Sequence, residues 1–263
     1  MPRRLAFRFS LACLTGMCAL LWMTVLAQAQ QKPKAPPQQD KPKQNAAAQP
    51  SPRMSMQPDP NWLKRHESFC ALAKKGEIDV LFLGDSITDA WRAKSQQEIW
   101  NKYFAPLKAA NFGIGGDRTQ HVLWRIQNGE LEGIQPKVVV LMIGTNNSGG
   151  RDNNAEEIAA GVTSIVKEIQ KRSPSTKILL LGIFPRGEKP NPQREKLEQV
   201  NQIIAKLDDG KSVKYLDIGK VFLEADGSIR REIMPDFLHL SVDGYQRWAD
   251  AIKEPLMGLL NGK

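Results

Sequence analysis

The sequence has little cysteine, and the little that it has is badly placed for disulfide bonds. Cys13 and Cys18 lie in an apolar stretch near the N-terminus, and only Cys70 lies beyond it. A single remaining cysteine can form no internal disulfide bond and no thiol-metal site. Disulfide-dependent and cysteine-zinc folds are therefore excluded, and the core must be held by packing alone.

The first 29 residues also lack any acidic side chain. They carry Arg3, Arg4 and Arg8, then an apolar run over 9–27, and the small-x-small sequence Ala-Gln-Ala at 27–29. This order is typical of a secretory signal peptide, and the run is also long enough for an uncleaved membrane anchor. We therefore expect residues 1–29 to direct export, to the periplasm or the outside, with membrane anchoring through the N-terminus if the run is not cleaved.

Residues 30–60 are nearly free of large apolar side chains and are rich in Gln, Lys, Pro and Ala. Such a segment buries too little surface to offset the entropy of folding, so we expect a disordered linker. Residues 61–263 are enough for one domain with a sizeable core.

The predicted domain lacks a marked charge of either sign. The whole chain carries a formal net charge of +9, but residues 1–60 hold eight of the 37 basic and two of the 28 acidic residues. The remaining 29 basic and 26 acidic residues leave +3. A binding surface for nucleic acid is not indicated.

The domain has no internal repeat, and short apolar runs alternate with segments of helical period. We expect strands over 79–83, 109–112, 138–143, 178–183 and 213–216. Helical spacing of apolar residues predicts helices over 155–172, 194–208 and 245–259. The run 138–143 is apolar on both faces, as in a parallel strand covered by helices. The pattern predicts an open, three-layer α/β sheet.

Four short motifs in a fixed order carry the chemistry. They are GDSIT at 84–88, NFGIGGD at 111–117, GTNN at 144–147 and DFLHLS at 236–241. The first three follow the first three predicted strands, whose carboxyl ends meet at one edge of such a sheet. Each motif alone is most simply a turn that needs glycine, but together they predict an acyl-transfer site.

Ser86 is the candidate nucleophile, at a predicted strand-to-helix turn. The sequence lacks the Gly-x-Ser-x-Gly elbow of α/β-hydrolases, because Thr88 stands where the second glycine would be. A serine hydroxyl needs a neighbouring base to remove its proton.

Only three histidines could supply that base. His66 precedes the first predicted strand, and His121 lies in a helical segment where packing explains it better. His239 follows Asp236 by three residues, a spacing that can bring both side chains to the same side of a turn. The carboxylate could then orient the imidazole and stabilise the imidazolium.

The tetrahedral intermediate also needs hydrogen-bond donors. The candidates are the backbone N–H groups of Ser86 and Gly116 and the side-chain amide of Asn146, with Asn147 as a competitor. A metal site is less favoured, because the acidic residues and the histidine in these motifs lack the spacing of metal ligands.

These motifs resemble those of the SGNH (GDSL-type) hydrolases, and most of all the catalytic subunits of the intracellular type I platelet-activating-factor acetylhydrolase. The resemblance covers about residues 62–260. Its specific runs are NFGIGGD at 111–117, HVLWR at 121–125, NGELE at 128–132, GTNN at 144–147, PRG at 185–187, PNP at 190–192 and DFLHL at 236–240.

The resemblance implies a flavodoxin-like, three-layer α/β/α fold with a five-stranded, mostly parallel sheet. It implies a triad of Ser86, Asp236 and His239, an oxyanion hole from Ser86, Gly116 and Asn146, no cofactor, and a homodimer. It also implies hydrolysis of short acyl esters. The leader, the basic linker and the stretch 148–154 depart from that family.

Three functions stay open at this point. The first is a serine esterase that removes acetyl or similar acyl groups from a glycan or a lipid. The second is a non-catalytic envelope protein that binds glycan or lipid on the same fold. The third is an O-acyltransferase with the same triad.

Overall fold

The computed structural model describes residues 45–54, 58–149 and 152–262. Their centre is a five-stranded sheet in the order β2-β1-β3-β4-β5, in which every pair of neighbouring strands is parallel. The strands are β1 (Val80–Gly84), β2 (Ala109–Asn111), β3 (Val138–Met142), β4 (Lys177–Leu181) and β5 (Val213–Leu216). All five predicted strands are confirmed, with ends that shift by no more than two residues.

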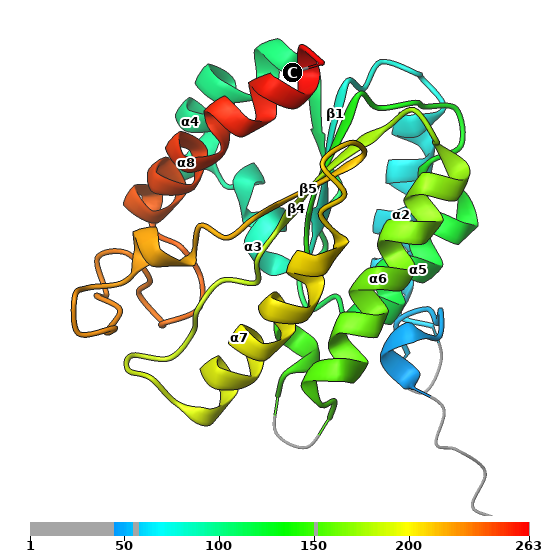
Figure 1. The fold of residues 1–263 in the computed structure, drawn as a ribbon. Coiled ribbons are helices and arrows are strands. Elements are labelled where there is room, and N and C mark those ends of the chain that lie inside the picture. The colour runs from blue at the N-terminus through cyan, green and yellow to red at the C-terminus, as the bar shows by residue number, and fades with distance from the viewer. Residues whose placement is uncertain (1–44, 55–57, 150–151, 263) are drawn as a thin grey trace, which may run out of the picture. The chain divides into compact units, whose positions relative to one another are not determined.

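Helices cover both faces of this sheet and complete a three-layer arrangement (Figure 1). The helices on one face are α2 (Pro60–Ala73), α5 (Thr119–Arg125), α6 (Ala155–Arg172) and α7 (Pro192–Ile204). The helices on the other face are α3 (Ser86–Asp89), α4 (Gln97–Tyr103) and α8 (Val242–Leu260). The predicted α/β/α fold is confirmed, as are the helices predicted over 155–172, 194–208 and 245–259.

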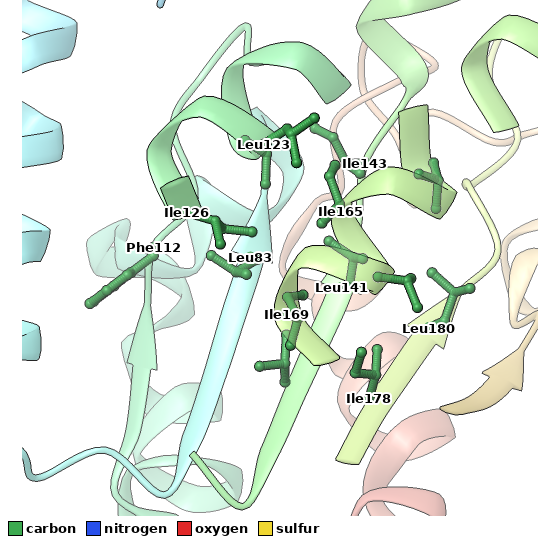
Figure 2. Packing of buried hydrophobic residues seen from close by; sticks show 14 of the residues in the cluster. Leu83, Phe112, Leu123, Ile126, Leu141, Ile143, Ile165, Ile169, Ile178 and Leu180 are labelled. Carbon is green, nitrogen blue, oxygen red and sulfur yellow. The ribbon is translucent and has the colours of Figure 1, made fainter. Parts of the chain in front are cut away.

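Alternate side chains of each strand belong to the two separate cores. In β1, Leu83 packs on the side of α5 and α6, whereas Phe82 packs on the side of α8. Figure 2 shows the first of these cores, where Leu141 of β3 lies among Ile165 and Ile169 of α6. Burial on both faces explains why the strands are continuous apolar runs. The parallel pairing of β1 with β2 and with β3 places the carboxyl ends of these three strands at one edge.

The folded unit begins upstream of the domain boundary expected at residue 61. It spans Gln44–Lys263, and the 3-10 turn η1 (Ala46–Ala48) packs on α5 and α6. The Thr119 hydroxyl donates to the Ala47 carbonyl at 2.7 Å, and the Asn45 amide donates to the Glu157 carbonyl at 3.0 Å. The predicted leader over 1–29, and the predicted linker up to residue 44, lie outside the described residues.

Candidate active site

Ser86 lies at the turn from β1 into α3, and its neighbours fix that turn. Gly84 has no room for a side chain, because a Cβ there would lie 2.1 Å from the Thr88 hydroxyl oxygen. Asp85 caps α3, since its Oδ1 accepts the Ile87 N–H at 3.0 Å. Ser86 is therefore the first helical residue, and its backbone N–H has no intrahelical partner.

Ser86, His239 and Asp236 form one hydrogen-bonded chain. Nε2 of His239 lies 2.9 Å from Ser86 Oγ, and its Nδ1 lies 2.7 Å from Asp236 Oδ2. The other carboxylate oxygen of Asp236 accepts the backbone N–H groups of Leu238 at 3.1 Å and His239 at 2.7 Å. This is the geometry in which an imidazole can accept the serine proton while a carboxylate holds the ring.

The loop that carries this histidine has an unusual backbone, which the rest of the fold supports. Phe237 has a φ of 59°, a left-handed conformation that is uncommon outside glycine and is often found at functional sites. Its carbonyl accepts the Gly187 N–H at 2.8 Å. The buried guanidinium of Arg194 in α7 donates to the carbonyls of Arg186, Gly187 and Gly227. Helix α7 thus holds the histidine loop in place through the loop 186–191.

The carboxylate of Asp236 remains ionised although it is partly covered. Burial raises the pKa of the Asp236 carboxyl, but hydrogen bonds from the ring and the backbone of His239 outweigh this and hold the pKa below its ordinary value. The Asp236 side chain is 55% exposed and that of His239 is 42% exposed. Substrate can therefore reach both residues from solvent.

The candidate oxyanion donors lie on the loops that follow three strands, and the Gly115–Gly116 loop packs against Ser86. A Cβ on Gly115 would lie 3.8 Å from the Ser86 Cβ, and the next residue, Gly116, has a φ of 79° that favours glycine. The Asn146 side-chain amide donates to the Asp117 carbonyl at 2.9 Å and keeps a second N–H. Among the described residues, none accepts a hydrogen bond from the N–H of Ser86 or of Gly116.

From the sequence, either Asn146 or Asn147 could donate to the oxyanion. The two side chains have different hydrogen-bond partners in the structure. Asn147 is fully buried, and its Oδ1 accepts the Thr119 N–H at 3.0 Å. Its Nδ2 donates to Gln120 at 3.1 Å and to Asn153 at 3.2 Å. Asn147 therefore closes the loop after β3, which leaves Asn146 as the candidate donor.

The other two histidines have different partners. His66 is buried between Glu130, at 3.0 Å from Nδ1, and the Asn128 carbonyl, at 3.1 Å from Nε2. Nδ1 of His121 accepts the Arg118 N–H at 3.1 Å, and burial, with help from nearby arginines, lowers the pKa of His121 to about 4. Both rings serve the fold, as the sequence suggested for His121.

Asp85 is a buried acid directly beside the serine. Its Oδ2 has no hydrogen-bond partner within the described part of the chain. Burial raises the pKa of Asp85 to about 7, against the opposing effect of the Ile87 N–H, and the nearby carboxylate of Asp117 adds to the rise. The side chain is therefore poised between its neutral and its ionised form near neutral pH.

A buried ionic network behind the Gly116 loop escaped the sequence analysis. Arg125 is fully buried, 2.9 Å from Asp117 Oδ2 through Nε and 2.8 Å from Glu130 Oε1 through Nη1. The Trp62 indole donates to Asp117 at 2.7 Å, and His66 contacts Glu130. Burial acts to lower the pKa of Arg125, but the two carboxylates outweigh it and raise that pKa. The four-residue spacing of 117, 121 and 125, which runs from the loop before α5 to its last residue, was the available signal.

Metal and thiol chemistry find little support in the described residues. Within 45–54, 58–149 and 152–262, no group of three His, Cys, Asp or Glu side chains converges as metal ligands would. Burial and the neighbouring Glu130 and Glu132 raise the pKa of the Cys70 thiol to about 11, so little of it is thiolate at neutral pH.

The model of the GDSL-like lipase/acylhydrolase family matches residues 82–247, a range that contains every residue of the proposed triad and oxyanion hole. The chain belongs to this family. Like its relatives, this GDSL-type protein is a carboxylic ester hydrolase, so the non-catalytic alternative does not hold.

Within this family, the chain is similar to subunits of platelet-activating factor acetylhydrolase IB. The chain is 47% identical over 217 residues to platelet-activating factor acetylhydrolase IB subunit alpha2 of Rattus norvegicus, which covers 82% of this chain and 92% of the relative. It is 44% identical over 218 residues to the alpha1 subunit of Homo sapiens, with the same coverage.

Solved structures share the fold. A GDSL-like lipase of Bacteroides thetaiotaomicron superposes with a TM-score of 0.61 at 20% identity, and covers 75% of this chain and 97% of that one. An acetylxylan esterase of Geobacillus stearothermophilus reaches 0.54 at 20% identity, and covers 72% and 96%.

These relatives correct the predicted location. The chain matches acetylhydrolase IB subunits, the type that the sequence comparison above gave as intracellular, and this match contradicts export. The expectation of a periplasmic or extracellular enzyme is therefore wrong. It rested on the charge and hydropathy of residues 1–29 alone, outside the described residues and outside 82–247. Among the described residues, no helix has the length and apolar character to cross a membrane.

Proposed function

We propose that this GDSL-type hydrolase is a serine esterase for short, acetyl-type acyl esters. In this proposal Ser86 is the nucleophile, His239 the base and Asp236 the residue that orients it. The observation that carries the proposal is the continuous hydrogen-bonded chain from Ser86 Oγ to Asp236, at 2.9 and 2.7 Å. It lies beside backbone N–H groups that have no protein acceptor among the described residues.

The chemistry follows from these contacts. Nε2 of His239 takes the Ser86 proton as Oγ attacks the ester carbonyl, and the carbonyl oxygen becomes negative. The N–H groups of Ser86 and Gly116 and the second amide N–H of Asn146 stabilise that charge, at roughly 3–4 kcal/mol for each well-placed donor. The imidazolium then gives its proton to the departing alkoxide. Water, deprotonated by the same ring, then attacks the acyl carbonyl, and the ring returns the proton to Ser86 Oγ as the carboxylic acid leaves.

The names of the relatives support an acetyl group as the acyl part of the ester. The alcohol part, a glycan or a lipid, is decided by assay. One set of relatives is named for platelet-activating factor acetylhydrolase and one fold neighbour for acetylxylan esterase, and both names specify acetyl groups. A series of p-nitrophenyl esters should show the highest kcat/KM for acetate. Parallel assays of acetylated xylan and an acetylated ether phospholipid then decide between glycan and lipid.

The decisive variant is Ser86→Ala. It should abolish hydrolysis of p-nitrophenyl acetate and labelling by a fluorophosphonate probe, while the melting temperature stays within a few degrees. Ser68→Ala is the matched control, because that hydroxyl donates only to the Arg65 carbonyl one turn away in α2. Turnover by Ser86→Ala equal to that of Ser68→Ala would overturn the proposal.

The predicted homodimer also belongs here, since the relatives are named as subunits. Sedimentation equilibrium of the purified chain at micromolar concentration tests it. A mass of one chain, about 29.4 kDa, at every concentration would contradict it.

A further inference from the structure

Arg53 lies upstream of α2, yet its side chain contacts the loop of the proposed oxyanion hole. Its Nη1 donates to the Gly115 carbonyl at 2.8 Å. A Cβ placed on Gly116 would lie 3.3 Å from Nη1, 3.4 Å from Nη2 and 3.5 Å from Cζ. The guanidinium therefore lies against the Gly115–Gly116 peptide, 62 residues away in sequence.

The backbone around Arg53 is tied to the domain on both sides. The Ser51 N–H donates to the Gln120 carbonyl at 3.2 Å, and the Asp59 N–H donates to the Arg53 carbonyl at 3.0 Å. The carboxylate nearest to the guanidinium is that of Asp59, 3.7 Å from Nε. Since that pair is solvent-exposed, at 40% for Arg53 and 30% for Asp59, its attraction is weak. The bond to the Gly115 carbonyl is the closer contact.

The Gly115 carbonyl and the Gly116 N–H belong to one peptide group. This group is planar and trans, so its oxygen and its N–H point in opposite directions. A cation bound at the oxygen fixes the plane of the peptide and draws electron density toward the oxygen. The opposite N–H then becomes a stronger donor, because hydrogen bonds in series polarise one another. That N–H is the donor proposed to bind the oxyanion.

The preceding residue is held from the other side. The Gly115 N–H donates to Asp89 Oδ2 at 3.2 Å, and the other oxygen of Asp89 binds Arg65 at 2.6 Å and Arg92 at 3.0 Å. The loop is thus clamped at the Gly115 nitrogen by a carboxylate and at the Gly115 oxygen by a guanidinium. Of these two clamps, only Arg53 acts on the peptide whose N–H faces the substrate.

We propose that Arg53 is a positioning residue of the oxyanion hole. It holds and polarises the Gly115–Gly116 peptide, and its effect grows as negative charge develops on the ester oxygen. This inference rests on the proposed esterase function. It extends the catalytic apparatus to a residue upstream of the range 82–247 that matches the family.

Arg53→Ala should lower kcat for p-nitrophenyl acetate about 10- to 100-fold, less than the loss of a direct oxyanion donor. KM should change by less than about threefold, since ground-state binding does not use the polarised N–H. Arg53→Lys should keep most of the activity, because an ammonium group can donate to the same carbonyl. Added guanidinium chloride, at millimolar concentration, should restore part of the activity of Arg53→Ala.

The matched control is Arg118→Ala. It removes an arginine of similar exposure, 36%, whose guanidinium binds Asp152 at 2.7 Å and not the Gly115 peptide. Its kcat should equal that of the unaltered chain, and guanidinium should not increase it.

A second measurement separates electrostatics from a merely structural role. A trifluoromethyl ketone forms a tetrahedral adduct on a catalytic serine, and its affinity should fall in Arg53→Ala by the same factor as kcat/KM. Equal kcat losses in Arg53→Ala and Arg118→Ala would overturn the inference. An effect on KM alone would also overturn it. So would a kcat loss in Arg53→Ala that Arg53→Lys does not recover although the melting temperature is unchanged. If the unaltered chain hydrolysed no ester and bound no ketone, the proposed function itself would fail.

Discussion

Asp236 performs its proposed task from an exposed position. Its side chain is 55% exposed, so water screens its charge and weakens its electrostatic effect on the imidazolium. Its geometry is nevertheless tightly set, because one oxygen accepts two backbone N–H groups and the other faces Nδ1 of His239. This arrangement favours orientation of the ring as the main contribution of Asp236.

We therefore predict that Asp236→Asn costs less than His239→Ala. An asparagine can still accept the two backbone N–H groups, but its amide donates to the ring and favours the wrong tautomer, which should lower kcat about 10³- to 10⁴-fold. Loss of the base itself should cost about 10⁵-fold or more. Steady-state kinetics of both variants with p-nitrophenyl acetate measure the difference. Equal losses in the two variants would contradict an orienting role.

Asp85 should make stability depend on pH. Its pKa is about 7 in the folded protein and about 4 in an unfolded chain. Between these pH values the unfolded chain has lost a proton that the folded chain keeps, so the free energy of unfolding falls as the pH rises from about 4 to about 7. Asp85→Asn removes this term. The variant should gain about 1–3 kcal/mol relative to the unaltered chain between pH 4 and pH 8.

Urea unfolding of both proteins at the two pH values measures that gain. Asp250→Asn is a control, because hydrogen bonds from Tyr103 and Gln246 lower the pKa of Asp250 and give the opposite sign. A stability difference between Asp85→Asn and the unaltered chain that is the same at both pH values would contradict the assignment of this buried acid.

At the scale of elements, the sequence predicts those with a strong internal pattern. The strands β1, β3 and β4 are apolar runs, and α6 has an amphipathic period and a capping box in which Asn154 and Glu157 bond reciprocally. Helix α2 was missed because it adjoins the Pro- and Gln-rich stretch. Its signals were Asp59 as the N-cap and Pro60 in the first turn, followed by apolar residues at helical spacing.

The packing of η1 on α6 gives a prediction at this scale. A Cβ on Gly161 would lie 2.5 Å from both the Ala47 carbonyl and the Thr119 hydroxyl, so alanine must push the segment 45–48 away. Gly161→Ala should destabilise the protein although alanine favours helix. A Cβ on Gly258, in α8, would have no atom within 4 Å. Gly258→Ala should therefore stabilise the protein by about 0.5 kcal/mol. Thermal unfolding compares the two, and a stabilising Gly161→Ala would refute the contact.

At the scale of the whole molecule, the site residues that lie in short motifs could be predicted, and those that depend on long-range contacts could not. Ser86, Gly116, Asn146 and the Asp236–His239 pair each follow from a local pattern, and the fold brings them together, while their roles stay predictions. Arg53 could not be predicted, because its contact spans 62 residues and its neighbours look like linker. The burial of Arg125 could not be predicted for a related reason, since Asp117 precedes α5 and Glu130 follows it.

The same reasoning predicts where the chain can be shortened. A chain that begins at Gln44 keeps the whole folded unit, and should match the full-length protein in kcat and melting temperature. A chain that begins at Asp59 loses the Ala47 and Asn45 contacts together with Arg53. It should melt several degrees lower, because the buried Ala47 and its hydrogen bond to Thr119 are removed. Its kcat should fall at least as far as that of Arg53→Ala, whose fold keeps that segment. Full activity in the chain from Asp59 would show that catalysis does not depend on residues before α2, and the Arg53 assignment would have to be abandoned. An unchanged melting temperature in the same chain would contradict the upstream domain boundary.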